Sequence, residues 1–158
     1  METHKVISID PGKTTGYCYA DLTPGISLEY HPFQSFDDVD DLWRRLKEYE
    51  PQYIIIEDFE FRQKSRAGLV LFPVQMIGVA RLYSLIAPPP VSLYLQKAAQ
   101  GKSYYKDPIL KKNDLYVRGL PHGMDASRHL LHWITFGAGY QYNSSKGSIN
   151  DFAKMIGV

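Results

Sequence analysis

The stretch VISIDPGKTTGY, residues 6–17, decides the fold of this chain. β-Branched residues at positions 6, 7 and 9 predict a buried strand that ends at Asp10, and Pro11-Gly12 stops the strand from continuing. A carboxylate on a buried strand costs free energy unless the protein uses it. Asp also commonly starts turns before Pro-Gly, so a structural and a functional interpretation of Asp10 both stay open at this point.

The first third of the sequence predicts three strands and a helix. We expect the strands over residues 4–10, 16–22 and about 26–31, and the short turns between them favour antiparallel pairing. Ser35 and Asp38 resemble a capping box, and apolar residues recur at helical spacing after them until a proline ends the helix.

A second apolar run, residues 53–57, also ends in an acid, Glu57. Because this run follows a helical crossover, it should lie parallel to the first strand and bring Glu57 and Asp10 to the same edge of the sheet. Two like charges held close together cost free energy unless a proton or a cation lies between them. The alternative is that Glu57 is an ordinary strand-end acid that faces solvent.

The middle of the chain predicts a helix that is too apolar for one buried face. It extends from about residue 69 to Ile86, with Pro73 in its first turn or at a kink. One apolar face would cover the sheet, and the surplus suggests a subunit interface. A proline connector then leads to a short strand over residues 91–95, and a short helix is possible over residues 149–156.

The last strong helix is expected from about residue 121 to residue 136. His122 and Asp125 are three residues apart and therefore share one face of its first turn. His129 and His132 continue that face, and the alternative for these two histidines is an amphipathic stripe against the core.

Length and composition favour a single domain without disulfides. The chain has 158 residues and one cysteine, and we expect a core over about residues 4–138 with a polar extension over 139–158. Charges near the amino terminus argue against a signal peptide, and the longest apolar stretch is too interrupted to span a membrane. We therefore expect a cytoplasmic protein.

The charges are unevenly distributed although the net charge is only +1. Residues 1–60 hold 5 Lys/Arg and 13 Asp/Glu, whereas residues 61–113 hold 9 Lys/Arg and one acid. Such a basic segment favours binding to a polyanion, with a lysine-rich solvated surface as the alternative. Tyrosines in residues 96–113 could add base stacking to phosphate contacts. The basic residues that would contact a nucleic-acid backbone are Arg62, Lys64, Arg66, Lys97, Lys102 and Lys106.

Three motifs in order resemble those of the RuvC family of Holliday junction resolvases, within the ribonuclease H-like superfamily. The motifs are Ile-Asp-Pro-Gly at 9–12 with Thr-Gly-Tyr at 15–17, Ile56-Glu57 followed by aromatics, and His122-x-x-Asp125-Ala. The resemblance covers about residues 4–138, and the chain is more similar to the small RuvC-like proteins of phages than to a standard bacterial member.

The resemblance implies an α/β fold: a mixed five-stranded sheet, with three antiparallel N-terminal strands followed by parallel strands, and helices on both faces. It also implies that Asp10, Glu57, His122 and Asp125 are catalytic and bind two Mg²⁺ ions, for which Mn²⁺ can substitute. The implied protein is a homodimer in a bacterial cell, possibly phage-encoded, that makes paired symmetric nicks in four-way DNA junctions by two-metal hydrolysis. Phe59 or Phe61 would stack on an opened base.

The chain departs from the family pattern at the lysines that flank a glycine loop. Aligning Gly101 with that loop places Gln96, not the adjacent Lys97, at the first lysine position. Lys106 matches the second lysine with an offset of one residue. The opening loop at residues 13–15 is also shortened, so the roles of these positions stay open.

Other classes of function share parts of this pattern. An ATPase of the actin and hexokinase type also has a strand-borne Asp before a Gly-Thr turn, but it needs two such lobes and this chain has room for one. Gly12-Lys13-Thr14 imitates the end of a P-loop, but the glycine required five residues earlier is Ile7. A non-catalytic module that binds branched DNA, or a nuclease on another structured nucleic acid such as precursor ribosomal RNA, remains the alternative.

Overall fold

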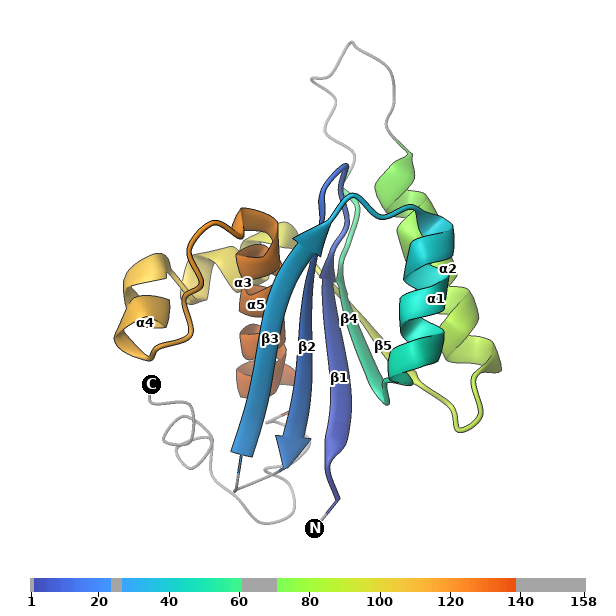
Figure 1. Cartoon of the computed structure of the whole chain (residues 1–158), viewed down its shortest axis with the longest axis horizontal. Helices are drawn as coiled ribbons and strands as arrows, with labels where there is room; N and C mark the ends of the chain where they lie inside the picture. Colours follow the sequence, from blue (N-terminus) through green and yellow to red (C-terminus); the bar gives the residue numbers. More distant parts are fainter. Residues whose placement is uncertain (1, 24–26, 61–70, 139–158) are drawn as a thin grey trace.

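The computed structural model describes residues 2–23, 27–60 and 71–138, which build one five-stranded sheet and its covering helices (Figure 1). In chain order the elements are β1 (His4–Asp10), β2 (Thr15–Thr23), β3 (Ser27–Ser35), α1 (Val39–Tyr49), β4 (Tyr53–Glu57), α2 (Phe72–Ile86), β5 (Ser92–Gln96), α3 (Ala98–Tyr104), α4 (Asp107–Lys112), α5 (Pro121–His132) and the π-helix η1 (Trp133–Ala138).

The sheet has the strand order β3-β2-β1-β4-β5. β1, β2 and β3 pair antiparallel, whereas β4 is parallel to β1 and β5 is parallel to β4. This topology confirms the predicted mixed sheet. β3 is longer than predicted because it pairs with the whole of β2, and its Pro32 is tolerated because β3 lies at the edge of the sheet.

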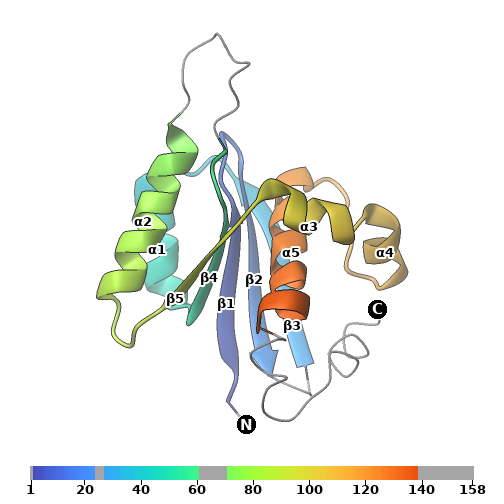
Figure 2. The same cartoon turned by 180° about the vertical axis from the view of Figure 1, so that it is seen from behind.

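Helices cover both faces of the sheet, as predicted (Figures 1 and 2). Because successive strand residues point to opposite faces, Ile7, Ile9 and Ile56 pack on the side of α1 and α2. Val6 and Ile55 pack on the other side, in the core that α5 and η1 complete. α3 packs against α5, and α4 follows it away from the sheet (Figure 2).

The start of α1 differs from the prediction. Asp38 is the N-cap residue, its side chain accepts a hydrogen bond from the backbone of Asp41, and the side chain of Asp41 accepts one from Asp38 in return. Ser35 instead ends β3. The capping box therefore lies one turn later than predicted, because pairing with β2 holds Ser35 in the sheet.

The basic segment 96–113 folds into two short helices, α3 and α4, that its sequence did not predict. Tyr105 is buried and its hydroxyl is hydrogen-bonded to Thr135, so this ring cannot stack on a base as expected. Tyr104 remains partly exposed and packs edge-on against Phe136. The stacking surface expected from the tyrosines is therefore wrong for Tyr105.

Several sequence predictions lie outside the described residues. Phe61, Arg62, Lys64 and Arg66 fall in residues 61–70, together with the predicted start of the apolar helix, and the possible helix at 149–156 falls beyond residue 138. Within the described part, α2 begins at Phe72 and holds Pro73 in its first turn, as expected. The helices of residues 2–23, 27–60 and 71–138 include none long and apolar enough to cross a membrane.

Candidate active site

The parallel strands β1 and β4 deliver two carboxylates to the same point. Their register pairs Ile9 with Ile56, so the next residues, Asp10 and Glu57, end neighbouring strands. Both acids follow isoleucines that face α1 and α2, and the alternation of side chains therefore turns both toward α5. Asp10 is only 7% exposed, so polar contacts must compensate for the burial of its carboxylate.

The first turn of α5 lies over Asp10. The backbone N–H of His122 donates to Oε1 of Gln34 on β3 at 3.0 Å, which ties this end of the helix to the sheet. The His122 ring then places its Nδ1 3.1 Å from Oδ2 of Asp10. His122 and Asp10 therefore lie side by side, as the spacing of the motifs predicts.

A glycine on β2 makes this close approach possible. Gly16 is the register partner of Asp10, and a Cβ atom at this position would lie 1.9 Å from the carbonyl oxygen of His122. Any side chain at Gly16 would therefore push α5 away from the acids.

Lys102 connects Asp125 with Glu57. Its Nζ lies 3.0 Å from Oδ2 of Asp125 and 3.6 Å from Oε2 of Glu57. Burial lowers the pKa of this lysine, but the hydrogen bond to Asp125 and the charges of the surrounding acids outweigh it and leave the pKa above its usual value. α3 reaches this position because Gly101 packs on the backbone of α5, where a Cβ atom would lie 2.9 Å from the N of His129.

The sequence alone leaves the role of His129 open, and the structure places this residue in the acid cluster. It is fully buried, its Nε2 lies 2.9 Å from Oε2 of Glu57, and its Nδ1 lies 2.9 Å from Oε1 of Gln96. The available signal was spacing, since His129 follows Asp125 by four residues and shares its helix face. His132, the other histidine left undecided, packs against the ring of Phe136 instead.

Arg128 holds Asp125 from the other side. Its Nη1 donates to Oδ1 of Asp125 at 2.6 Å, and its Nε donates to the carbonyl oxygen of Tyr105 at 2.9 Å. The same guanidinium also pairs with Asp107 at the start of α4. At 12% exposure, this side chain is part of the packed structure.

The two strand-end acids differ in their electrostatic environment. Burial, followed by the charge of Glu57, raises the pKa of Asp10 to about 6, and the hydrogen bond from His122 only partly opposes this shift. Burial also acts on Glu57, but the hydrogen bond from His129 and the charge of Lys102 outweigh it, so the pKa of Glu57 lies below its usual value. The site thus accumulates negative charge that a cation would relieve.

The donors suit a divalent cation in type, although they do not form a closed coordination shell. Within residues 2–23, 27–60 and 71–138, no three His, Cys, Asp or Glu side chains surround a common ion position. Asp10, Glu57 and Asp125 are instead paired with His122, His129, Lys102 and Arg128. Carboxylate oxygens with one imidazole nitrogen are ligands that Mg²⁺ and Mn²⁺ accept, so the donor chemistry fits these ions.

The predicted DNA contacts separate into four groups. Lys102 belongs to the acid cluster, and Lys97 and Lys106 are exposed at the starts of α3 and α4. Phe59 lines a recess of about 300 Å³ together with Glu57 and Lys102. Phe61, Arg62, Lys64 and Arg66 lie outside the described residues.

The structure also gives the placement of the two candidates for the first family lysine. Gln96 ends β5, is buried and contacts His129, whereas Lys97 is exposed. Gln96 therefore contacts His129 inside the site and is not exposed for a contact with a phosphate backbone.

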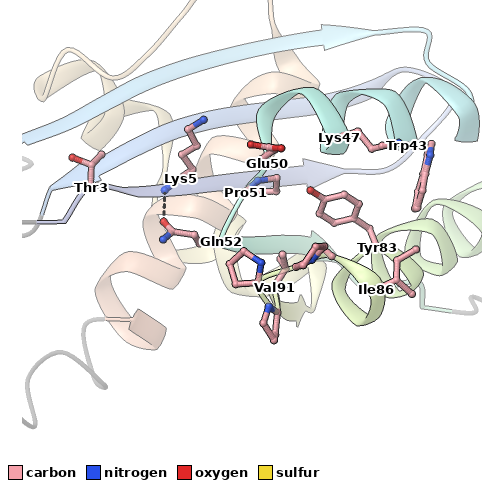
Figure 3. Close-up of a pocket in the computed structure, with 14 residues that line it drawn as sticks. Thr3, Lys5, Trp43, Lys47, Glu50, Pro51, Gln52, Tyr83, Ile86 and Val91 are labelled. Carbon is pink, nitrogen blue, oxygen red and sulfur yellow. Dashed lines mark hydrogen bonds between the residues drawn. The ribbon is translucent and has the colours of Figure 1, made fainter.

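A larger recess, of about 600 Å³, lies at the opposite ends of β1 and β4 (Figure 3). Its lining includes Trp43, Tyr83 and the consecutive prolines 88–90, and it contains none of the predicted site residues. Lys5 at its wall donates its backbone N–H to Oε1 of Gln52 at 3.0 Å.

Comparison with known proteins identifies the class to which this fold belongs. No family model and no curated protein matches the sequence. Among solved structures, RuvC of Thermus thermophilus in complex with a Holliday junction substrate is similar, with a TM-score of 0.59, 15% identity, and coverage of 81% of this chain and 91% of that chain.

Two further resolvases share this architecture. The fowlpox virus Holliday junction resolvase has a TM-score of 0.51 at 15% identity and covers 88% of this chain and 99% of its own. The yeast mitochondrial Holliday junction resolvase Ydc2 has a TM-score of 0.53 at 15% identity, with coverage of 87% and 80%. The chain thus has the RuvC-like, ribonuclease H-like fold of these resolvases, as its motifs predicted.

Proposed function

We propose that this protein is a metal-dependent endonuclease that cuts four-way or other branched DNA junctions. The observation that carries the proposal is the convergence of Asp10, Glu57, His122 and Asp125 at the carboxyl ends of β1 and β4 and the first turn of α5. A cluster of this charge is unfavourable in an ordinary core and favourable around divalent cations.

The four residues would hold the cations through carboxylate oxygens and one imidazole nitrogen. Bound divalent cations would supply the activation of water and the charge stabilisation of the leaving 3′ oxygen that phosphodiester hydrolysis requires. The chain contributes a buried carboxylate at Asp10, oriented by His122, and a Glu57 that stays ionised because of His129 and Lys102. No covalent nucleophile is needed.

The surface beside the acids suits a phosphate backbone. Lys97, Lys102 and Lys106 project from α3 and its flanks, and all three are exposed. Because Lys102 already contacts Asp125, a phosphate bound by this lysine would lie next to the acids. Phe59, in the recess beside Glu57, is the described aromatic that could stack on an opened base.

We further propose that two copies associate through α2, so that two identical sites can nick a symmetric junction. Met76, Ala80 and Tyr83 bury one face of this helix, while Leu71, Val74, Leu82 and Leu85 are exposed. Gly78 lies within the exposed apolar face, and a Cβ atom there would meet nothing within 4 Å, which leaves room for close helix approach.

The interface can be tested by replacing exposed apolar residues with charges. Leu82→Glu combined with Leu85→Glu should give a monomer that nicks junctions on one strand only, because a paired second site is lost. Light scattering at micromolar concentration, with and without junction DNA, measures the oligomeric state. A parent protein that is monomeric in both conditions would contradict the homodimer.

The activity itself is tested with labelled four-way, flap and linear DNA, and with a labelled structured RNA, in Mg²⁺ or Mn²⁺. We expect cleavage of the branched substrates, with paired nicks on the four-way junction, and no cleavage in EDTA. Junction binding without cleavage in either metal would identify a non-catalytic binding module. Preferred cutting of structured RNA would identify the alternative nuclease.

A further inference from the structure

We propose that His129 is a positioning residue, and that the chain of hydrogen bonds from Gln96 through His129 to Glu57 fixes this carboxylate for cation binding. The inference rests on the proposed function, because it concerns the cations of that site. The His129 ring lies between the two other side chains, with Nδ1 2.9 Å from Gln96 and Nε2 2.9 Å from Glu57.

The sheet register explains why one ring can contact both residues. β4 and β5 are parallel, and Glu57 and Gln96 are direct partners in their register. The two side chains therefore leave adjacent strand ends on the same face of the sheet. The backbone N–H of Asp58 also donates to the carbonyl oxygen of Gln96 at 2.7 Å, which extends the link between the strands by one residue. His129, from α5, thus spans two strands at the point where both end.

Packing alone does not account for a histidine at this position. Its helix neighbours Leu130 and Leu131 are fully buried, and an apolar side chain at 129 would bury its surface without needing polar partners. The imidazole instead has a partner on each nitrogen, and no other side chain in the described α5 is both wholly buried and in contact with a strand-end acid. A polar group satisfied in this way fixes the orientation of its partners.

The chemistry of the three side chains decides which group donates and which accepts in this series of hydrogen bonds. Ionised Glu57 can only accept, so the His129 nitrogen that faces it donates. A glutamine amide has an acceptor oxygen and a donor nitrogen, and it can therefore complement the other ring nitrogen in either protonation pattern. Hydrogen bonds of this kind to a ligating carboxylate hold its oxygens in place and strengthen metal binding.

The test measures Mn²⁺ binding to the DNA-free protein by calorimetry for the parent, His129→Leu, His129→Gln and Gln96→Leu. His129→Leu removes the donor and should weaken Mn²⁺ binding about 10- to 100-fold. His129→Gln should retain affinity within about threefold, because its amide nitrogen can take the place of Nε2. Gln96→Leu leaves the His129 donor in place but removes the partner that orients its ring. Its loss of Mn²⁺ affinity should therefore lie between those of His129→Leu and His129→Gln.

Two controls separate positioning from folding. His132→Leu, at the last residue of α5, should leave Mn²⁺ affinity unchanged, and every variant should bind junction DNA in EDTA within about twofold of the parent. Thermal unfolding in EDTA reports whether each variant folds. If His129→Leu does not fold, the other two variants still decide the outcome. The proposal requires Gln96→Leu to bind Mn²⁺ more weakly than His129→Gln does.

The possible failures are distinguishable. In one case the parent binds Mn²⁺ and the folded variants His129→Leu and Gln96→Leu bind it equally well. This result would overturn the positioning role alone. A parent that binds no Mn²⁺ would overturn the proposed metal-dependent function and the positioning role with it.

Discussion

Among the residues that the structure describes, a recess lies at each end of β1 and β4, and only the recess at the carboxyl ends lies beside the acid cluster. The recess at the amino ends has a volume of about 600 Å³, and its lining joins aromatic rings such as Trp43 and Tyr83 with the charged side chains of Lys5, Lys47 and Glu50 (Figure 3). The recess at the carboxyl ends has a volume of about 300 Å³ and contains Glu57 and Lys102. The recess at the amino ends is the larger of the two, but the strand-end acids Asp10 and Glu57 lie at the carboxyl ends.

The polar groups at the two ends have different partners. At the amino end, Lys5 donates from Nζ to the backbone carbonyl of Tyr49 at 3.1 Å, and this hydrogen bond connects β1 to the last residue of α1. At the carboxyl end, Asp10 and Glu57 are like charges, and burial raises the pKa of Asp10 to about 6. Perturbed acids held close together mark a functional site more specifically than an apolar hollow does.

The largest expected difference between the two ends is in catalysis. Asp10→Asn should lower the rate of junction nicking by at least about 10²-fold, because it removes a charged group at the reacting centre. Junction binding should be unchanged or tighter, since one negative charge near the phosphates is lost. Nicking assays and gel shifts in EDTA measure both effects.

Trp43→Ala, in the recess at the amino ends, is the matched control for Asp10→Asn. It should destabilise the protein by about 1–3 kcal/mol and leave the nicking rate of the folded protein unchanged. Near-parental nicking by Asp10→Asn would contradict a catalytic role for Asp10.

His122 allows the ligand type itself to be tested. His122→Ala should lose most of the nicking activity, by about 10- to 100-fold, while the protein remains folded. His122→Asp should retain cleavage, with its preference moved from Mn²⁺ toward Mg²⁺ because oxygen replaces nitrogen. Parental rates for His122→Ala in both metals, measured beside its circular dichroism spectrum, would make His122 a structural residue.

Gly16→Ala should separate the helix from the acids. The added methyl group would lie 1.9 Å from the carbonyl oxygen of His122, so α5 must shift, at a cost of about 1–3 kcal/mol in the free energy of unfolding. Mn²⁺ affinity should fall with it. Gly78→Ala, where a methyl group has open space within one copy of the chain, should change the stability of that copy by less than about 1 kcal/mol and leave Mn²⁺ affinity unchanged. Equal effects of the two substitutions on Mn²⁺ affinity would contradict this account.

The raised pKa of Asp10 predicts a pH-dependent stability in the absence of metal. Asp10 binds its proton more tightly in the folded protein, where its pKa is about 6, than in the unfolded chain, where its pKa has the ordinary value of 3.8. The stability contribution is therefore complete below about pH 4 and is lost as the pH rises to about 6. The loss amounts to at most about 3 kcal/mol. Urea unfolding in EDTA should show this decline for the parent and not for Asp10→Asn, and an equal decline in both proteins would assign it to another group.

The smallest expected contrast is between two lysines. Lys102 lies between Asp125 and Glu57, so Lys102→Ala should strengthen Mn²⁺ binding by up to about fivefold, the equivalent of a partly exposed ion pair of about 1 kcal/mol. Lys47→Ala, at the recess of the amino ends, should leave Mn²⁺ affinity unchanged. Calorimetry distinguishes the two, and weaker binding by Lys102→Ala would mean that the lysine supports the ion.

The sequence predicted the parts of the site that depend on strand geometry. Asp10 and Glu57 follow from an apolar run, a turn and the parallel register, all of which are local or near-local signals. The contact between His129 and Glu57 joins residues 72 positions apart, and the apolar pattern of α5 does not reveal which polar residue finds a partner on a strand. α3 and α4 were missed because they are short and lysine-rich, with little apolar periodicity.

Arg128 gives the lysine-bearing helices a rigid connection to the acid cluster. One guanidinium binds Asp125, the carbonyl of Tyr105 at the end of α3 and Asp107 at the start of α4. A displacement of the junction between α3 and α4 must therefore either break these bonds or carry the Asp125 carboxylate with it. A force on the lysines of α3 and α4 would therefore reach Asp125, one of the four proposed ligands, through the side chain of Arg128.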